Sequence, residues 1–171
     1  MKFSVDELKS VLKPGDIILF HSNSCLNWAI RTITQSYWGH VAMFIGDDLF
    51  VESAAEGVHI LDIAVLTVYD IEILRYKPKL QKSTIKSIIE YCKKSTGSPY
   101  DYIAIVQLLF YLLKGRRDRL EDIGEKRKYI CSEILAEAYM TYGCDILPGR
   151  KSSEIIPADY DISPNFTRVE I

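Results

Sequence analysis

The stretch HVAMFIGDDLFVESAAEGVHIL, which covers residues 40–61, predicts the centre of a β-sheet. It contains three short runs rich in branched and aromatic residues, a composition typical of strands. The runs cover residues 40–45, 49–53 and 58–61, and the turns between them are Gly46-Asp47-Asp48 and Glu56-Gly57. Because strands joined by tight turns pair antiparallel with their neighbours, the stretch predicts an antiparallel sheet.

The rest of the chain adds mainly strands before residue 78 and long helices after it. Further strands are expected at residues 17–21, 71–77 and 166–171, and helices at residues 5–12, 23–34, 62–69, 83–94, 101–114 and 131–142. This order predicts an α+β fold, with the sheet packed against a helical layer, in one domain of residues 1–171. An exposed loop is expected at residues 115–128, and the proline-containing tail is expected to wrap the surface.

The overall composition argues against several classes of protein. A chain of 171 residues can bury a sizeable core without disulfides or a structural metal. It is 48% hydrophobic and 26% charged, as globular proteins are, and a net charge of −2 argues against nucleic-acid binding. The N-terminus carries charges where a secretory signal would be apolar, so a cytoplasmic location with reduced thiols is expected.

The longest apolar run covers residues 102–113 and is interrupted only by Gln107. It is shorter than the roughly 20 residues needed to cross a bilayer. A buried core helix is the favoured interpretation. The alternative is an apolar binding surface, because Arg116, Arg117 and Arg119 follow the run and would suit contact with a membrane surface.

Four cysteines are candidates for a reactive thiol. Cys131 begins the predicted helix in YICSEILAEAY, where the helix dipole stabilises a thiolate. From position alone, a buried structural cysteine is an equally good interpretation. Cys25 also begins a helix and is the rival nucleophile. Cys92 lies on an apolar helix face and Cys144 follows a helix end, so neither is favoured.

A base for the thiol would come from one of three histidines, His21, His40 and His59. His40 heads a predicted strand and can point into a cleft, whereas His21 ends a strand and His59 lies within one. Glu52 lies in the strand that follows His40. With a turn centred at residue 46, His40 and Glu52 are expected to lie roughly opposite one another, which would let Glu52 orient the imidazole.

Together these segments resemble the NlpC-type papain-like cysteine hydrolases with circularly permuted order, the YiiX/YaeF branch. The lecithin-retinol acyltransferase-like proteins are more distantly similar. The resemblance rests on LKPGDIILF (12–20), WGHVAMFIG (38–46) with FVESA (50–54), GSPYDY (97–102), YICSEILAEAY (129–139) and IIPADY (155–160). His40 precedes Cys131, which is the order of the permuted branch.

The resemblance implies a papain-like fold and a role for four residues. Cys131 would be the nucleophile, His40 the base and Glu52 the orienting residue. Tyr100 would stabilise the oxyanion together with the Cys131 backbone amide. No metal and no cofactor are implied. One departure is Gly39, because the family often has serine just before its catalytic histidine.

The expected function is that of a cysteine hydrolase acting through a thioacyl-enzyme. It would be an amidase or peptidase, or an acyl-ester hydrolase or transferase, with a peptide, a cell-wall fragment or a lipid as substrate. Peripheral membrane contact would accompany a lipid substrate. The alternative is a non-catalytic peptide- or lipid-binding module on the same fold. A redox pair of Cys131 and Cys144 is disfavoured, because the intervening helix separates them by roughly 18 Å.

Overall fold

The predicted antiparallel sheet is confirmed by the computed structural model, which describes residues 2–115 and 128–170. Six strands pair in the order β4-β3-β2-β1-β5-β6, and every neighbouring pair is antiparallel. The strands are β1 (Ile17–His21), β2 (His40–Gly46), β3 (Leu49–Ala54), β4 (Gly57–Asp62), β5 (Asp70–Tyr76) and β6 (Phe166–Arg168). The stretch first quoted therefore forms half of the sheet.

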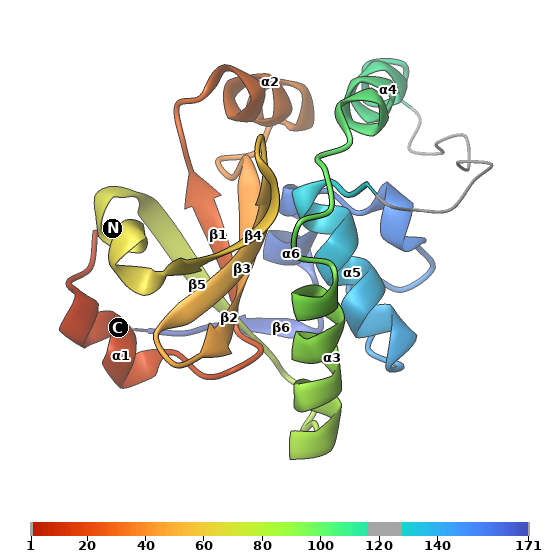
Figure 1. Ribbon diagram of the computed structural model, residues 1–171. Coiled ribbons are helices and arrows are strands. Elements are labelled where there is room, and N and C mark those ends of the chain that lie inside the picture. Colours follow the sequence, from red (N-terminus) through yellow and green to blue (C-terminus); the bar gives the residue numbers. More distant parts are fainter. Residues whose placement is uncertain (1, 116–127, 171) are drawn as a thin grey trace.

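Helices lie on both sides of the sheet and beyond one of its ends, with α1 on the side opposite α3 and α5 (Figure 1). They are α1 (Val5–Val11), α2 (Cys25–Thr34), α3 (Lys82–Lys94), α4 (Tyr102–Leu113), α5 (Cys131–Thr141) and α6 (Pro157–Ile162), with 3₁₀ helices η1 (Ile63–Val68) and η2 (Ser152–Glu154). Figure 1 shows α3, α5 and α6 beside the sheet and α2 with α4 beyond its end. The predicted helical layer is thus present.

Alternating strand residues bury the sheet on both faces. Leu19 and Met43 pack in a cluster with Leu135 of α5. Ile18 and Phe44 point to the other face and pack in a cluster with α1 and η1. Because both faces are covered, the strand residues form near-continuous apolar runs rather than a simple alternation.

The C-terminal tail does not merely wrap the surface, as the sequence had suggested. Pro157 opens α6 at a first-turn position, where its missing N–H costs nothing. The Tyr160 side chain is fully buried, and its hydroxyl donates to the Ser132 carbonyl at 2.8 Å. Phe166 packs in the same cluster as α5, and the last strand ends at Arg168 rather than at the chain end. The tail therefore completes the core and supports α5.

Only one face of the apolar helix α4 is buried, so the prediction of a core helix holds for that face and is wrong for the other. Ala104, Ile105 and Leu108 are buried against α2. The opposite face is exposed and carries Tyr102, Ile103, Val106, Phe110 and Leu113. Across the two described ranges, no helix is long and apolar enough to cross a membrane. The predicted loop after α4 lies almost wholly outside the described residues.

Gly39 determines how closely α2 approaches the sheet. A Cβ atom at this position would lie 2.8 Å from the Asn27 carbonyl oxygen and 3.0 Å from Cγ of Arg31. The helix backbone therefore occupies the space that any side chain would need. This close packing is a physical reason for glycine, instead of serine, just before His40.

We expect Gly39→Ser to lower the free energy of unfolding by about 1–3 kcal/mol, because the added atoms must displace the α2 backbone. Urea denaturation followed by circular dichroism measures this change. Gly39→Ala adds the same Cβ without a hydroxyl and should lose a similar amount. Wild-type stability in both variants would contradict the steric explanation.

Candidate active site

His40, Glu52 and Cys131 come together from three different elements. His40 is the first residue of β2, Glu52 lies within β3, and Cys131 is the first residue of α5. The three residues are distant in sequence, and each is nearly buried. The side chains of His40 and Glu52 are each 12% exposed, and the Cys131 residue is 2% exposed.

The imidazole of His40 contacts the Glu52 carboxylate directly. Nε2 of His40 lies 2.7 Å from Oε2 of Glu52, and because a carboxylate only accepts, this nitrogen donates. The two residues lie only roughly opposite one another, since the direct partner of Glu52 is Ala42, two residues from His40. The side chains still meet, because His40 and Ala42 share one face of the sheet and Glu52 reaches His40 diagonally.

The Cys131 side chain also acts on the His40 ring, through its charge and by hydrogen bonding, and both effects raise the pKa of the ring. With Nε2 directed at Glu52, Nδ1 is the nitrogen left for the sulfur. Burial by itself lowers the pKa of His40. The charge and hydrogen bond of Cys131, followed by those of Glu52, outweigh burial and raise the pKa to about 10. The arrangement therefore favours the protonated form of the His40 ring.

The start of α5 is anchored on both sides of Cys131. Oγ of Ser53, next to Glu52, donates to the Tyr129 carbonyl at 2.9 Å. Oγ of Ser132 donates to the Ile155 carbonyl at 2.6 Å. The first bond joins the segment before α5 to β3, and the second joins the helix to the C-terminal tail. Together they fix the position of the thiol relative to the sheet.

Tyr100 lies beside this group, in the segment that precedes α4. The Asp101 amide donates to the Tyr129 carbonyl at 3.2 Å, which holds Tyr100 close to the start of α5. The Tyr100 residue is 6% exposed. Burial, and then the charge of Cys131, raises the pKa of its hydroxyl, so that it stays a proton donor at neutral pH.

A cavity of about 560 Å³ opens beside these residues. His40, Glu52 and Tyr100 lie on its wall, and α2 contributes Cys25 and Asn27. The apolar part of the wall includes Phe20, Phe50, Leu61, Val65 and Tyr69. A cavity whose wall combines apolar side chains with polar groups is typical of a small-molecule or peptide-end site.

The other cysteines lack this environment. Cys25, the rival nucleophile, is exposed and lines the same cavity. The His40 ring interacts with Glu52 and Cys131 rather than with Cys25. Cys92 is fully buried, as its apolar position predicted, and burial raises its pKa to about 12. Burial also raises the pKa of Cys144. All four cysteines are free, so no Cys131–Cys144 disulfide forms.

His59 is the member of the group that sequence reasoning missed. It lies opposite Glu52 in the β3–β4 pair, and its Nε2 is 3.0 Å from Oε1 of Glu52. Burial raises the pKa of Glu52, but the hydrogen bonds and charges of His40 and His59 outweigh it and lower the pKa. The signal was present in the short β3–β4 turn, which places these two residues on facing positions.

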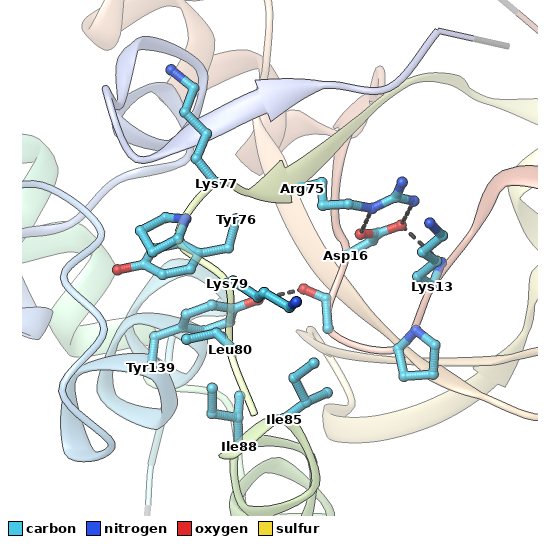
Figure 2. Close-up of a pocket in the computed structure, with 13 residues that line it drawn as sticks. Lys13, Asp16, Arg75, Tyr76, Lys77, Lys79, Leu80, Ile85, Ile88 and Tyr139 are labelled. Atoms are coloured by element: carbon cyan, nitrogen blue, oxygen red, sulfur yellow. Dashed lines mark hydrogen bonds and ion pairs between the residues drawn. The ribbon is translucent and has the colours of Figure 1, made fainter. Parts of the chain in front are cut away.

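A second cavity, of about 270 Å³, lies at the other end of α5 (Figure 2). Tyr139, on its wall, is about 12 Å along the helix from Cys131 at 1.5 Å per residue. Asp16 there forms an ion pair with Arg75 at 2.6 Å, and the Tyr139 hydroxyl donates to the Gly15 carbonyl. These contacts are internal to the fold, and the cavity is separate from the thiol.

The profile of one protein family matches most of the chain, residues 11–152. That family is described as "Permuted papain-like amidase enzyme, YaeF/YiiX, C92 family". A curated Escherichia coli protein named "Probable lipoprotein peptidase YaeF" is 25% identical over 171 residues. The match covers 86% of this chain and 62% of that protein, so the chain spans less than two thirds of its relative.

A solved structure has the same fold. The crystal structure of Escherichia coli yiiX, a protein named there as a metalloprotein, superposes with a TM-score of 0.69 at 16% identity. The superposition covers 92% of this chain and 96% of that one. In this chain, no three His, Cys, Asp or Glu side chains within residues 2–115 and 128–170 are grouped to hold a metal ion.

Proposed function

Because the chain belongs to the permuted papain-like amidase family, we propose that it cleaves amide bonds with Cys131 as nucleophile and His40 as base. The observation that carries the proposal is the continuous contact from the Cys131 thiol through His40 to Glu52. Glu52 orients the ring and stabilises the imidazolium, which is the role of the acidic member of a triad.

In the proposed mechanism, Nδ1 of His40 already holds the proton of the Cys131 thiol when the substrate binds, as the raised pKa of the ring favours. The sulfur attacks the substrate carbonyl, and the C=O π pair moves onto oxygen to give a tetrahedral oxyanion. When that intermediate collapses, the C–N bond breaks and His40 returns the proton to the leaving amine. Water, deprotonated by His40, then hydrolyses the thioester and restores the thiol.

Two groups are placed to stabilise the oxyanion. The first turn of α5 has no side-chain cap, which leaves its backbone N–H groups available near the Cys131 sulfur. The Tyr100 hydroxyl, which keeps its proton, is the second donor. The positive end of the helix dipole adds to both.

A second candidate is an acyl-ester or lipid substrate, with hydrolysis or transfer of the acyl group. One observation favours it. Tyr102 lies on the cavity wall and begins the exposed apolar face of α4, where Ile103 and Val106 are each 65% exposed. An apolar surface beside a cavity suits an acyl chain.

A panel of acyl-amide, dipeptide-amide and lipid-ester substrates, incubated with the purified chain, separates these possibilities. We expect turnover of the amides, blocked by prior alkylation of Cys131. Cys144→Ser is the matched control, because it replaces a buried thiol far from His40 with a hydroxyl. It should leave both the turnover and its block by alkylation unchanged. Ligand binding without turnover of any substrate would instead indicate the binding module.

We expect the alkaline limb of the pH profile of kcat/KM to lie near pH 10, where His40 loses its proton. Glu52→Gln removes the carboxylate that stabilises the imidazolium, so the limb should move to lower pH by about 1–3 units. Glu56→Gln is the matched control, because it removes an exposed carboxylate from the same cavity wall. Equal shifts in both variants would contradict a direct His40–Glu52 interaction.

A further inference from the structure

His59 has hydrogen-bond acceptors at both of its ring nitrogens. Nε2 lies 3.0 Å from Oε1 of Glu52, and Nδ1 lies 2.9 Å from the carbonyl oxygen of Gly57. A backbone carbonyl has no proton to donate, and an ionised carboxylate has none either. Each contact is a hydrogen bond only when the ring nitrogen that faces it carries a proton.

Glu52 is consequently held by a separate ring at each oxygen. Oε2 accepts from His40 at 2.7 Å, and Oε1 accepts from His59 at 3.0 Å. Its side chain is 12% exposed, whereas that of His59 is 27% exposed. A largely buried carboxylate that lost one of its donors would be free to rotate and would be poorly solvated.

Glu52 thus lies between two imidazole rings in a nearly buried site. One ring nitrogen at each carboxylate oxygen takes the place of water, which lowers the cost of keeping the carboxylate ionised.

The backbone places His59 for this contact. Gly57, which begins β4, has a φ of +97°, and a Cβ there would lie 2.3 Å from the Ser98 carbonyl oxygen. The tight turn before it brings β4 back so that His59 faces Glu52 across the pair. The Gly57 carbonyl oxygen then contacts Nδ1 of the His59 ring at 2.9 Å.

We propose that His59 is a positioning residue that fixes the Glu52 carboxylate by hydrogen bonding, and through it the orientation of the His40 ring. This inference rests on the proposed function, in which His40 activates Cys131. His59 does not itself line the cavity, and its ring contacts Glu52 and the Gly57 carbonyl, so we expect it to act through Glu52.

Proton NMR of the histidine rings tests the contact without any substrate. At pH 6 the wild-type protein should show two hydrogen-bonded ring N–H resonances for His59, assigned by their loss in His59→Gln. Glu52→Gln should remove or strongly shift the Nε2–H resonance and keep the Nδ1–H resonance that faces Gly57. Unchanged Nε2–H in Glu52→Gln would overturn the contact.

Alkylation of Cys131 by iodoacetamide at pH 7, followed by peptide mass spectrometry, tests the positioning role. His59→Leu should slow the labelling of Cys131 by about tenfold in the wild-type background. In a protein that already carries Glu52→Gln, the same change should slow labelling by less than about twofold, because the effects of coupled residues are not additive. His59→Gln keeps an N–H donor and should label faster than His59→Leu. Additive effects, or equal rates in the two His59 variants, would overturn the proposal.

His21→Gln is the matched control. His21 is a part-buried histidine with its own hydrogen bonds, but it contacts Tyr37 and Arg31 rather than Glu52. It should leave the Cys131 labelling rate at the wild-type value. If wild-type Cys131 labels no faster than Cys144, the proposed function fails. If Cys131 labels rapidly and His59→Leu does not change its rate, only the present inference fails.

Discussion

Cys131→Ala is expected to abolish amide hydrolysis, with kcat reduced by about 10⁴-fold or more, the scale on which loss of a triad nucleophile acts. The physical reason is that the sulfur forms the covalent bond to the acyl group, and no other thiol adjoins His40. Steady-state kinetics on the best amide of the substrate panel measures the loss.

The fold should survive this change. The thiol is small, and the start of α5 is held by the Ser53 and Ser132 hydroxyls, which the substitution leaves in place. Circular dichroism and a urea unfolding curve check this, and Cys144→Ser reports what loss of a buried thiol does by itself. Turnover retained by a folded Cys131→Ala protein would contradict the covalent mechanism.

His40→Gln is expected to lower kcat by about 10²–10⁴-fold, the range typical of a lost general acid–base. Glutamine occupies similar space but cannot shuttle the proton between the thiol and the leaving group. Without the imidazolium, Cys131 would also lose its neighbouring positive charge. Its alkylation rate at pH 7 should fall about tenfold or more, because an unassisted thiol is mostly protonated there.

The exposed Cys25 provides an internal control for this experiment. It lines the same cavity, but its thiol does not contact the His40 ring, so its labelling rate should change little in His40→Gln. Equal slowing of Cys25 and Cys131 would indicate a general disturbance of the cavity. An unchanged Cys131 rate would show that His40 does not activate the thiol.

Local sequence patterns were sufficient for the elements that carry the site. The alternation of apolar runs and turns predicted β2, β3 and β4, and the apolar helix pattern with a following glycine predicted α5 starting at Cys131. These features depend on neighbours only a few residues away, so periodicity reveals them. Their register was predicted only roughly, because the β2–β3 turn lies between the paired residues Gly46 and Leu49 and an irregularity follows Phe44, so that Glu52 lies opposite Ala42.

Other features depend on contacts between distant segments. The burial of Tyr160 requires α5 to lie beside the tail, and the half-exposed face of α4 exists because α2 covers only its other side. The need for glycine at residue 39 likewise comes from the backbone of α2, twelve residues earlier at Asn27. No pattern within one element contains this information.

By itself, the sequence determined the α+β class and the order of histidine before cysteine, and it offered Cys131, His40 and Glu52 as candidates, to which the family resemblance added Tyr100. Tertiary structure alone decided that the His40 ring bonds both Cys131 and Glu52, and that His59 holds the other oxygen of that carboxylate. The physical reason is that a residue's type and local spacing specify its element. Hydrogen-bond partners and proton positions depend instead on which atoms the packed chain brings within about 3 Å.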